Sequence, residues 1–271
     1  MTRAPTFIHL TDLHAHCEGK VDGIDTMANL DAALAMIVAI EPAPDFVIVS
    51  GDLTDKGDAS SYRSVRQRLE TLGMPVLCAL GNHDSRPGFH EGMLDRTADL
   101  EAPYFYDRVF DGVHVIVLDT SVPGKVSGSL GDDQFAFLDA ATIRHPDLPK
   151  IVVMHHGPRV VTESPFAWES LNEAETERLR RTLAGRPVAG ILTGHIHHDG
   201  VSLWHGVPVV VGNGLHDFID PTYRKGLKIH AGASFGHCTL RESGLSVAFV
   251  PLPSDRRHLV TLDAETVRGF E

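Results

Sequence analysis

The sequence predicts an α/β protein built around buried, mostly parallel β-strands. Short and continuous apolar runs are typical of strands that are covered on both faces of a parallel sheet. Stretches with apolar residues at three- and four-residue spacing lie between these runs and predict amphipathic helices. The chain has 271 residues, of which 42% are hydrophobic, so it is long enough to bury a sizeable core.

The N-terminal region predicts the order βαβαβ. We expect strands over residues 6–10, 45–50 and 76–80, because each range is a compact apolar run. A helix over 24–40 is indicated by Met27, Leu30, Leu34 and Ile37, and Pro42 and Pro44 end it. A second helix over 62–72 ends before Gly73 and Pro75.

Residues 86–193 continue the alternation. Residues 86–108 are ambiguous and suit a short helix followed by Tyr104-Phe105-Tyr106. Strands are expected over 114–119, 151–154 and 188–193, and a helix over 132–143. Asn172 and Glu175 are spaced as in a capping box, which predicts that another helix begins there.

From about Val201 the sequence becomes β-rich, with turns rich in Gly and Ser and no clear helix. The chain has neither a recognisable linker nor an internal repeat, so a single domain over residues 1–271 is expected. Residues 1–200 carry the motifs, and residues 201–271 supply β-structure for oligomerisation or substrate loops. The last 20 residues are either a mobile tail or a packing tail.

Composition narrows the class of function. The net charge is 24 minus 36, or −12, which disfavours long nucleic acids and favours a small anionic substrate. The three cysteines, Cys17, Cys78 and Cys238, are scattered, as expected in a reducing cytoplasm. Residues 1–10 lack the pattern of a signal peptide, and the longest apolar run is too short to span a membrane.

Polar side chains capable of binding metal follow five of the predicted strands. The segments are Asp12-Leu13-His14, Gly51-Asp52, Gly81-Asn82-His83-Asp84, His155-His156 and His195-Ile196-His197. A lone histidine after a strand is more often a structural residue, but five such ends in one chain make that interpretation improbable. The 17 histidines of the chain point the same way, because histidine is the commonest metal ligand.

These residue types suit two borderline or hard ions such as Mn, Fe, Co or Zn. If the segments are extended, Asp12 and His14 share one face, as do His195 and His197. Two cations need an anion between them, and Asp52 is the candidate bridge, helped by a bridging hydroxide. Two dications, two carboxylates and one hydroxide leave a charge of about +1, which suits a phosphodiester better than a monoester.

Other catalytic motifs are missing from the sequence. There is no GxSxG nucleophile elbow, no GxxxxGK phosphate loop and no GxGxxG after a strand. Gly128-Ser129-Leu130-Gly131 has the wrong frame for the first of these. The strand-end residues are therefore the strongest functional signal in the chain.

Taken together, the five segments resemble the calcineurin-like metallophosphoesterase family. The resemblance is closer to bacterial class III cyclic-nucleotide phosphodiesterases and their glycerophosphodiesterase relatives, and it covers residues 12–197. It implies a four-layer α/β/β/α sandwich with two mixed sheets, and hydrolysis of a small phosphodiester by a metal-bridging hydroxide. It also implies a homo-oligomer, to which Val247 to Leu252 could contribute.

The resemblance implies a role for each matching residue. One ion is held by Asp12, His14 and His197, and the other by Asn82, His155 and His195, with Asp52 bridging both. His83 is the noncoordinating residue that contacts the phosphate or protonates the leaving oxygen, and Asp84 orients it. No organic cofactor is implied.

Several alternatives stay open at this level. The same scaffold suits a phosphomonoesterase, a nucleotidase or a nuclease, and an inactive binding module is a remoter alternative. His156 is expected to support the metal ligands from behind. His216, Asp217, His230 and His237 either line a pocket or are ordinary loop residues. Where relatives place two prolines, Gly157-Pro158-Arg159 follows the histidine pair, so the loop to Leu171 is a candidate substrate-facing segment. Arg86 and Arg159 are either phosphate contacts or solvated surface residues.

Overall fold

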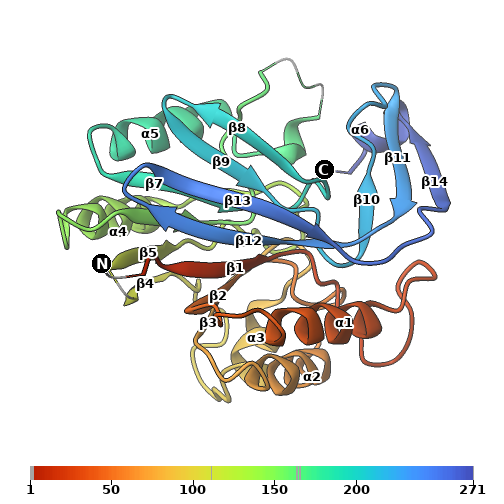
Figure 1. The fold of residues 1–271 in the computed structure, drawn as a ribbon. Helices are drawn as coiled ribbons and strands as arrows, with labels where there is room; N and C mark the ends of the chain where they lie inside the picture. Colours follow the sequence, from red (N-terminus) through yellow and green to blue (C-terminus); the bar gives the residue numbers. More distant parts are fainter. Residues whose placement is uncertain (1–2, 111, 163, 165, 271) are drawn as a thin grey trace.

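Two mixed β-sheets packed face to face form the centre of the computed structural model (Figure 1). The structure describes residues 3–110, 112–162, 164 and 166–270. Met1 and Thr2, which belong to the N-terminal stretch without a signal pattern, therefore lie outside the described residues, as do positions 163 and 165 of the loop before Leu171.

The first sheet has the strand order β13-β12-β1-β2-β3. Its strands are β1 (Thr6–Leu10), β2 (Phe46–Ser50), β3 (Val76–Ala79), β12 (Ser234–Arg241) and β13 (Gly244–Pro251). β1, β2 and β3 are parallel, whereas β12 pairs antiparallel with β1. The β-rich C-terminal region of the chain therefore completes the sheet that the N-terminus begins.

The second sheet has the order β4-β5-β6-β7-β9-β8. Its strands are β4 (Tyr106–Phe110), β5 (Val113–Val117), β6 (Lys150–Val153), β7 (Val188–Thr193), β8 (Gly200–Trp204) and β9 (Val207–Val211). β5, β6, β7 and β9 run parallel, and the two outer strands are antiparallel. Both sheets are thus mixed, as the sequence resemblance implies.

Helices cover the outer face of each sheet (Figure 1). Over the first sheet lie α1 (Thr26–Val38), α2 (Ala59–Glu70) and α3 (Arg86–Gly92), and over the second lie α4 (Asp132–Ile143) and α5 (Glu173–Leu183). Three apolar clusters separate these four layers, one between the sheets and one under each helical layer. The predicted α/β/β/α sandwich is confirmed.

The alternation of side chains along β1 explains the layering. Phe7 points into the cluster between the sheets, where it stacks on Phe46 at 4.9 Å between ring centroids. Ile8 and Leu10 point to the opposite face and pack under the helices. Both faces are apolar, which is why this strand is a continuous apolar run rather than an alternating one.

Several of the described helices begin at side-chain caps, although α4 does not. Asp25, Asp58 and Asn172 each accept a hydrogen bond from a backbone amide in the first turn of α1, α2 and α5. The predicted capping box is half formed. Asn172 accepts from the Glu175 amide, but the Glu175 carboxylate bonds Ser129 instead of reaching back to Asn172.

The end of the chain forms a small third sheet with the order β10-β11-β14. It contains β10 (Asp217–Ile219), β11 (Gly226–Ala231) and β14 (His258–Asp263), and α6 (Ala264–Arg268) follows. The expectation of no helix after Val201 is wrong, because Asp263 caps α6 and Val267 is fully buried. Of the two alternatives for the last 20 residues, the described ones form a packing tail.

The ambiguous range 86–108 resolves into α3 and the start of β4, joined by a turn-rich connection. Pro87 lies in the first turn of α3, where its missing amide proton costs no hydrogen bond. None of the described helices has the length and apolar character needed to cross a membrane.

Candidate metal centre

The strand-end residues predicted from the sequence lie along the carboxyl edge of the two sheets. Asp12 and His14 follow β1, Asp52 follows β2, and Asn82, His83 and Asp84 follow β3; His155 follows β6, and His195 and His197 follow β7. The facing sheets end at the same level, so residues up to 183 positions apart come within hydrogen-bond distance. Open α/β sheets commonly build ligand sites at this edge.

One group of ligand atoms lies around the end of β1. His14 Nε2 is 3.2 Å from His197 Nε2, and His197 Nε2 is 3.2 Å from Asp12 Oδ1. His14 Nε2 is also 3.6 Å from Asp52 Oδ2. Ligand atoms bound at about 2.1 Å to one ion lie roughly 3.0–3.4 Å apart, so these atoms are spaced to share an ion.

A second group lies beside it, around His155. His155 Nε2 is 3.2 Å from Asp52 Oδ2, the same oxygen that faces His14. His155 Nε2 and Asn82 Oδ1 are buried, and neither has a hydrogen-bond partner among the described residues. Buried polar atoms without partners are costly unless a ligand satisfies them. The two atoms therefore fit a cation that Asp52 shares with the first group.

Hydrogen bonds to the remote nitrogen of three imidazoles leave the other nitrogen free as a ligand. His155 Nδ1 donates to the Ser50 carbonyl at 2.9 Å, and His195 Nε2 donates to the Trp168 carbonyl at 2.9 Å. His197 Nδ1 lies 2.6 Å from Asp217 Oδ1. Since carbonyl and carboxylate oxygens only accept, each partner keeps one proton on its own side of the ring, so the neutral form of each imidazole has its lone pair on the opposite nitrogen.

The backbone at these ligands is not extended. The prediction that each pair shares a face because side chains alternate along an extended segment is therefore wrong. Asp12 and His14 have φ of 45° and 41°, and His195 and His197 have φ of 76° and 41°. These left-handed turns follow the ends of β1 and β7, where Asp12 and His14 donate their backbone amides to the carbonyls of Gly51 and Asp52. Strained backbone of this kind concentrates at functional sites.

The carboxylates of Asp52 and Asp12 favour positive charge beside the His155 ring. Burial alone disfavours a charged imidazole, but the carboxylates of Asp52 and Asp12 outweigh it and raise the pKa of His155 to about 9. Burial opposes ionisation of Asp52 as well, yet His155 holds the pKa of that carboxyl well below its usual range. Burial and the charge of His155 lower the pKa of His195 to about 3, so His195 is neutral at physiological pH.

His83 lies at the open side of the centre. Its side chain is 42% exposed, and its backbone amide donates to Asp52 Oδ1 at 2.8 Å. The ring stands edge-on to His14 with centroids 4.5 Å apart, and Nδ1 lies 3.1 Å from the Asp55 carbonyl. Because Nδ1 is engaged there, Nε2 is the ring nitrogen that remains free.

Asp84 does not orient His83, contrary to the expectation from the resemblance. Its buried carboxylate accepts hydrogen bonds from the backbone amides of Gly81, Leu53 and Thr54 and from the Tyr62 hydroxyl. Asp84 thus ties the loop after β3 to the loop after β2. Burial and the nearby Asp52 charge raise the pKa of Asp84 to about 7.

Sequence reasoning missed the carboxylate partners of three imidazoles. Asp55 Oδ1 lies 3.4 Å from His14 Nδ1 and 3.6 Å from His83 Nδ1, so Asp55 takes the place expected for Asp84. Asp217 reaches His197 from the C-terminal region. The sequence places Asp55 three residues after the predicted ligand Asp52, whereas Asp217 was expected only as a residue that lines a pocket in the C-terminal region.

Three of the residues with open roles have hydrogen-bond partners within the protein. His156 has both ring nitrogens engaged, with Thr120 Oγ1 at 2.8 Å and the Val126 carbonyl at 2.9 Å. Arg86 donates to Asp119 and the Ser121 carbonyl, and Arg159 donates to the carbonyls of Thr162 and Ser164. These contacts fit supporting roles for all three side chains and leave neither arginine as a solvated surface residue.

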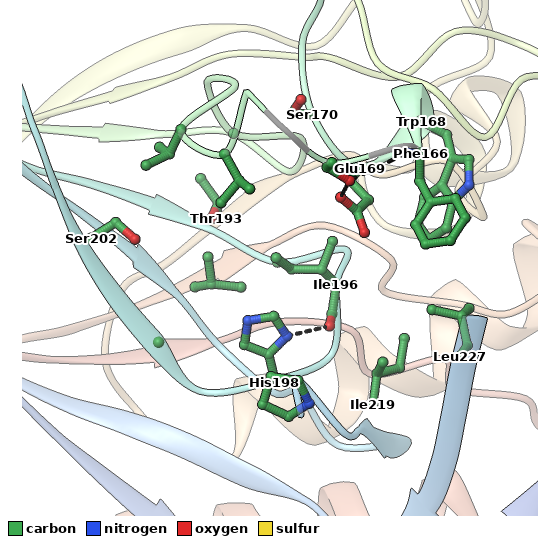
Figure 2. Close-up of a pocket in the computed structure, with 18 of the residues that line it drawn as sticks. Phe166, Trp168, Glu169, Ser170, Thr193, Ile196, His198, Ser202, Ile219 and Leu227 are labelled. Atoms are coloured by element: carbon green, nitrogen blue, oxygen red, sulfur yellow. Dashed lines mark hydrogen bonds between the residues drawn. The ribbon is translucent and has the colours of Figure 1, made fainter. Parts of the chain in front are cut away.

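A cavity of about 510 Å³ lies on the other side of the turn that follows β7. Figure 2 shows Ile196 and His198 at this cavity, together with Phe166 and Trp168 from the loop before α5. The flanking His195 and His197 belong to the metal-ligand groups instead. None of the predicted metal ligands lines the cavity, so it is separate from the candidate metal centre.

Comparisons with known proteins agree with this geometry. Residues 5–199 match the family model described as calcineurin-like phosphoesterase. The chain is 32% identical over 236 residues to a probable cyclic nucleotide phosphodiesterase of Rhodococcus erythropolis, covering 84% of this chain and 75% of that protein. It is 30% identical to a cAMP/cGMP dual specificity phosphodiesterase of Mycobacterium tuberculosis, covering 84% and 71%.

A more distant relative and a solved structure extend the comparison. A probable glycerophosphodiester phosphodiesterase of Arcobacter nitrofigilis is 25% identical, covering 75% of this chain and 76% of that protein. The fold is similar to that of a dimetal phosphatase from Danio rerio, with a TM-score of 0.64 and 15% identity, covering 92% of this chain and 99% of that one. The chain belongs to the calcineurin-like phosphoesterase family, a family of dimetal-dependent phosphoester hydrolases.

Proposed function

We propose that this protein is a phosphodiesterase that hydrolyses small phosphodiesters, cyclic nucleotides or glycerophosphodiesters, at a binuclear metal centre. The observation that carries the proposal is Asp52 Oδ2, which lies 3.6 Å from His14 Nε2 and 3.2 Å from His155 Nε2. One carboxylate oxygen thus faces two groups of ligand atoms. The names of the relatives favour diesters over other phosphoesters.

The proposed ligand set is the one that the sequence suggested. Asp12, His14 and His197 hold one ion; Asn82, His155 and His195 hold the other; and Asp52 bridges them. The donor atoms are oxygens and imidazole nitrogens without a thiolate, which suits Mn, Fe, Co or Zn. When bound, the two ions supply a water of lowered pKa and positive charge against the phosphate oxygens.

His83 is the proposed general acid. Its exposed ring can reach a bound substrate, and its contacts with Asp55 leave Nε2 free to give a proton to the departing oxygen. A general acid removes the need to expel an alkoxide and typically contributes about 100- to 10,000-fold. In this proposal Asp84 supports the loops, and Asp55 takes the positioning role.

Comparison of two chromogenic substrates tests the preference for diesters. The purified protein, loaded with Mn²⁺, should hydrolyse bis(p-nitrophenyl) phosphate with a higher kcat/KM than p-nitrophenyl phosphate. A centre of about +1 neutralises a singly charged diester but not a doubly charged monoester. The reverse order would indicate a phosphomonoesterase or nucleotidase, and failure to bind divalent ions would indicate an inactive binding module.

The organisation of the chain supports further elements of the proposal. We infer a single domain over residues 1–271, because β12 from the C-terminal region pairs with β1 inside the first sheet. We also infer a homo-oligomer and a cytoplasmic location; the three cysteines are free, as expected in a reducing compartment. Limited proteolysis that released a stable fragment ending near residue 200 would contradict the single domain.

A further inference from the structure

A segment outside the matched family region reaches the metal centre. The family model covers residues 5–199, whereas residues 215–219 precede and form β10. The Leu215 amide donates to the Asp12 carbonyl at 3.0 Å, and the Ile219 amide donates to the His197 carbonyl at 2.8 Å. This segment therefore holds the turns that carry two of the proposed ligands.

Asp217 lies between these two backbone contacts and points into the centre. It is only 7% exposed, and its Oδ1 lies 2.6 Å from His197 Nδ1. Its Oδ2 lies 3.2 Å from His216 Nδ1, and His216 Nε2 in turn lies 3.3 Å from the Val21 carbonyl. Both carboxylate oxygens are therefore engaged by imidazoles, and the carboxylate is held in place from two sides.

The hydrogen bond of His197 differs from those of His155 and His195 in the kind of acceptor. His155 and His195 donate to neutral backbone carbonyls, at Ser50 and Trp168, which mutation of a side chain cannot remove. His197 instead donates to an ionised side chain. A carboxylate in this position fixes the tautomer and ring orientation of a metal-binding histidine and makes the other nitrogen a better donor to the metal.

We propose that Asp217 is a positioning residue of the metal centre, which holds His197 with Nε2 directed at the ion shared with Asp12 and His14. This inference rests on the proposed ligand set. It makes the C-terminal region of the chain a component of the metal site, although the family match ends at residue 199. Removing the Asp217 carboxylate should weaken one metal site and leave the other intact.

Titration of the metal-free protein with Mn²⁺ tests the inference, with calorimetry for affinity and elemental analysis for stoichiometry. Loss of the hydrogen-bond partner behind a metal ligand typically costs about 10- to 100-fold in metal affinity. Asp217→Ala should weaken one of the two sites by about this factor. Asp217→Asn keeps an acceptor oxygen without the charge, so the metal affinity of this variant should fall by less.

Asp220→Asn is the matched control. Asp220 lies three residues further along the same segment, and its carboxylate bonds Thr222 and pairs with Lys228, away from the metal ligands. This variant should bind both ions like the wild type. The visible spectrum of the Co²⁺ form gives a second readout, because a change at the His197 site alters the absorption of one ion only.

The outcomes separate this inference from the proposed function. A wild-type protein that binds fewer than two ions would overturn the ligand set, and the role of Asp217 with it. A wild type with two ions and an Asp217→Ala variant with unchanged affinities and spectrum would overturn the positioning role alone. Equal weakening of both sites, together with a lower Tm of the metal-free protein, would also overturn it by showing a general structural role.

Discussion

At the scale of single residues, the side chains of the turn Gly81-Asn82-His83-Asp84 have different roles. Asn82 has a buried side-chain oxygen without a hydrogen-bond partner, and the neighbouring His83 remains exposed. Asp84 gathers three backbone amides and a tyrosine hydroxyl, and so holds the loops that carry Asp52 and Asn82 together. The residue adjacent to the candidate acid is thus structural.

Replacing His83 by alanine tests its role as an acid. We expect kcat to fall by about 100- to 10,000-fold while the protein still binds two ions, because His83 belongs to neither proposed ligand set. Steady-state kinetics and elemental analysis on the same preparation measure both quantities. His258→Ala, which changes an exposed histidine on β14, should leave both unchanged. Loss of an ion in proportion to activity would make His83 a ligand.

Gly81 is a second residue with a sharp prediction. A Cβ at this position would collide with the Asp52 carboxylate and lie 2.7 Å from the His155 ring. Gly81→Ala should therefore displace the proposed bridging ligand and reduce metal binding at both sites, as measured by elemental analysis after dialysis. Gly73→Ala is a control for the metal site: it also strains the backbone, at φ 65°, but its Cβ would meet nothing within 4 Å. Normal metal content in Gly81→Ala would show that Asp52 is dispensable.

The raised pKa of His155, about 9, predicts how metal binding depends on pH. A metal must displace the proton from His155 Nε2, so one proton is released wherever the pH lies below about 9. Apparent affinity at this site should rise about tenfold per pH unit from roughly pH 7 and level off above about pH 9. Calorimetry in buffers with different ionisation enthalpies measures the proton release. A flat profile over that range would contradict the assignment.

The same shift affects the stability of the metal-free protein. The pKa of His155 is higher in the folded state than the ordinary value of 6.5, so its contribution to stability is complete below pH 6.5 and is lost as pH rises through about 9. The metal-free protein should unfold at lower temperature at about pH 9.5 than at about pH 6.5. His155→Gln should reduce this difference in a thermal-shift measurement, and an undiminished difference would assign it to other groups.

At the scale of elements, the centre depends on contacts between segments that are distant in the chain. The 3₁₀ turn Ala167–Glu169 supplies the Trp168 carbonyl to His195, and the Trp168 indole donates to the Val267 carbonyl in α6. Val267 is fully buried in a cluster with Phe166, Trp168 and Leu227. The last helix therefore supports a loop that holds a proposed metal ligand.

Removing residues 258–271 should disturb that chain of contacts. The deletion removes β14, which pairs with β11, and α6, which covers Trp168. We expect a lower Tm and weaker metal binding at the site that includes His195. Trp168→Phe is the milder variant, since it keeps most of the packing and loses one hydrogen bond, worth about 1 kcal/mol. Unchanged metal affinity in the truncated protein would show that the tail is independent of the site.

At the scale of the whole molecule, the edge strand β8 of the second sheet exposes two large apolar side chains. Leu203 and Val201 on β8 are 75% and 57% exposed. Val247 to Leu252, which the sequence suggested for oligomer contacts, is largely used inside the protein: Val247 and Phe249 pack between the sheets, and Leu252 is buried. An uncharged edge strand commonly marks a place where chains pair.

Leu203→Glu tests this surface. If copies of the chain associate through β8, the variant should have a lower mass than the wild type by light scattering after size exclusion, because the charge would be buried without a partner. Ile143→Glu, at an exposed position at the end of α4, should keep the wild-type mass. Equal masses for all three proteins would place the contact elsewhere or show a monomer.

Local patterns in the sequence were sufficient for the architecture. Apolar runs and helical spacing predicted β1 to β3, α1, α2 and α4 to within a few residues, because burial on one or two faces imposes its period on the chain itself. The strand ends could also be predicted to converge, since parallel strands end at one edge of a sheet. The positions of Asp12, Asp52 and His155 relative to one another follow from this rule.

Only the tertiary structure decided how those residues are held. The left-handed backbone at Asp12 and His197, the amides that occupy Asp84, and the carboxylates of Asp55 and Asp217 all depend on which loops meet in space. Asp217 is the clearest case, because it comes from a β-rich segment without a recognisable motif. Periodicity is a property of neighbours along the chain, whereas hydrogen-bond partners are chosen by packing between distant segments.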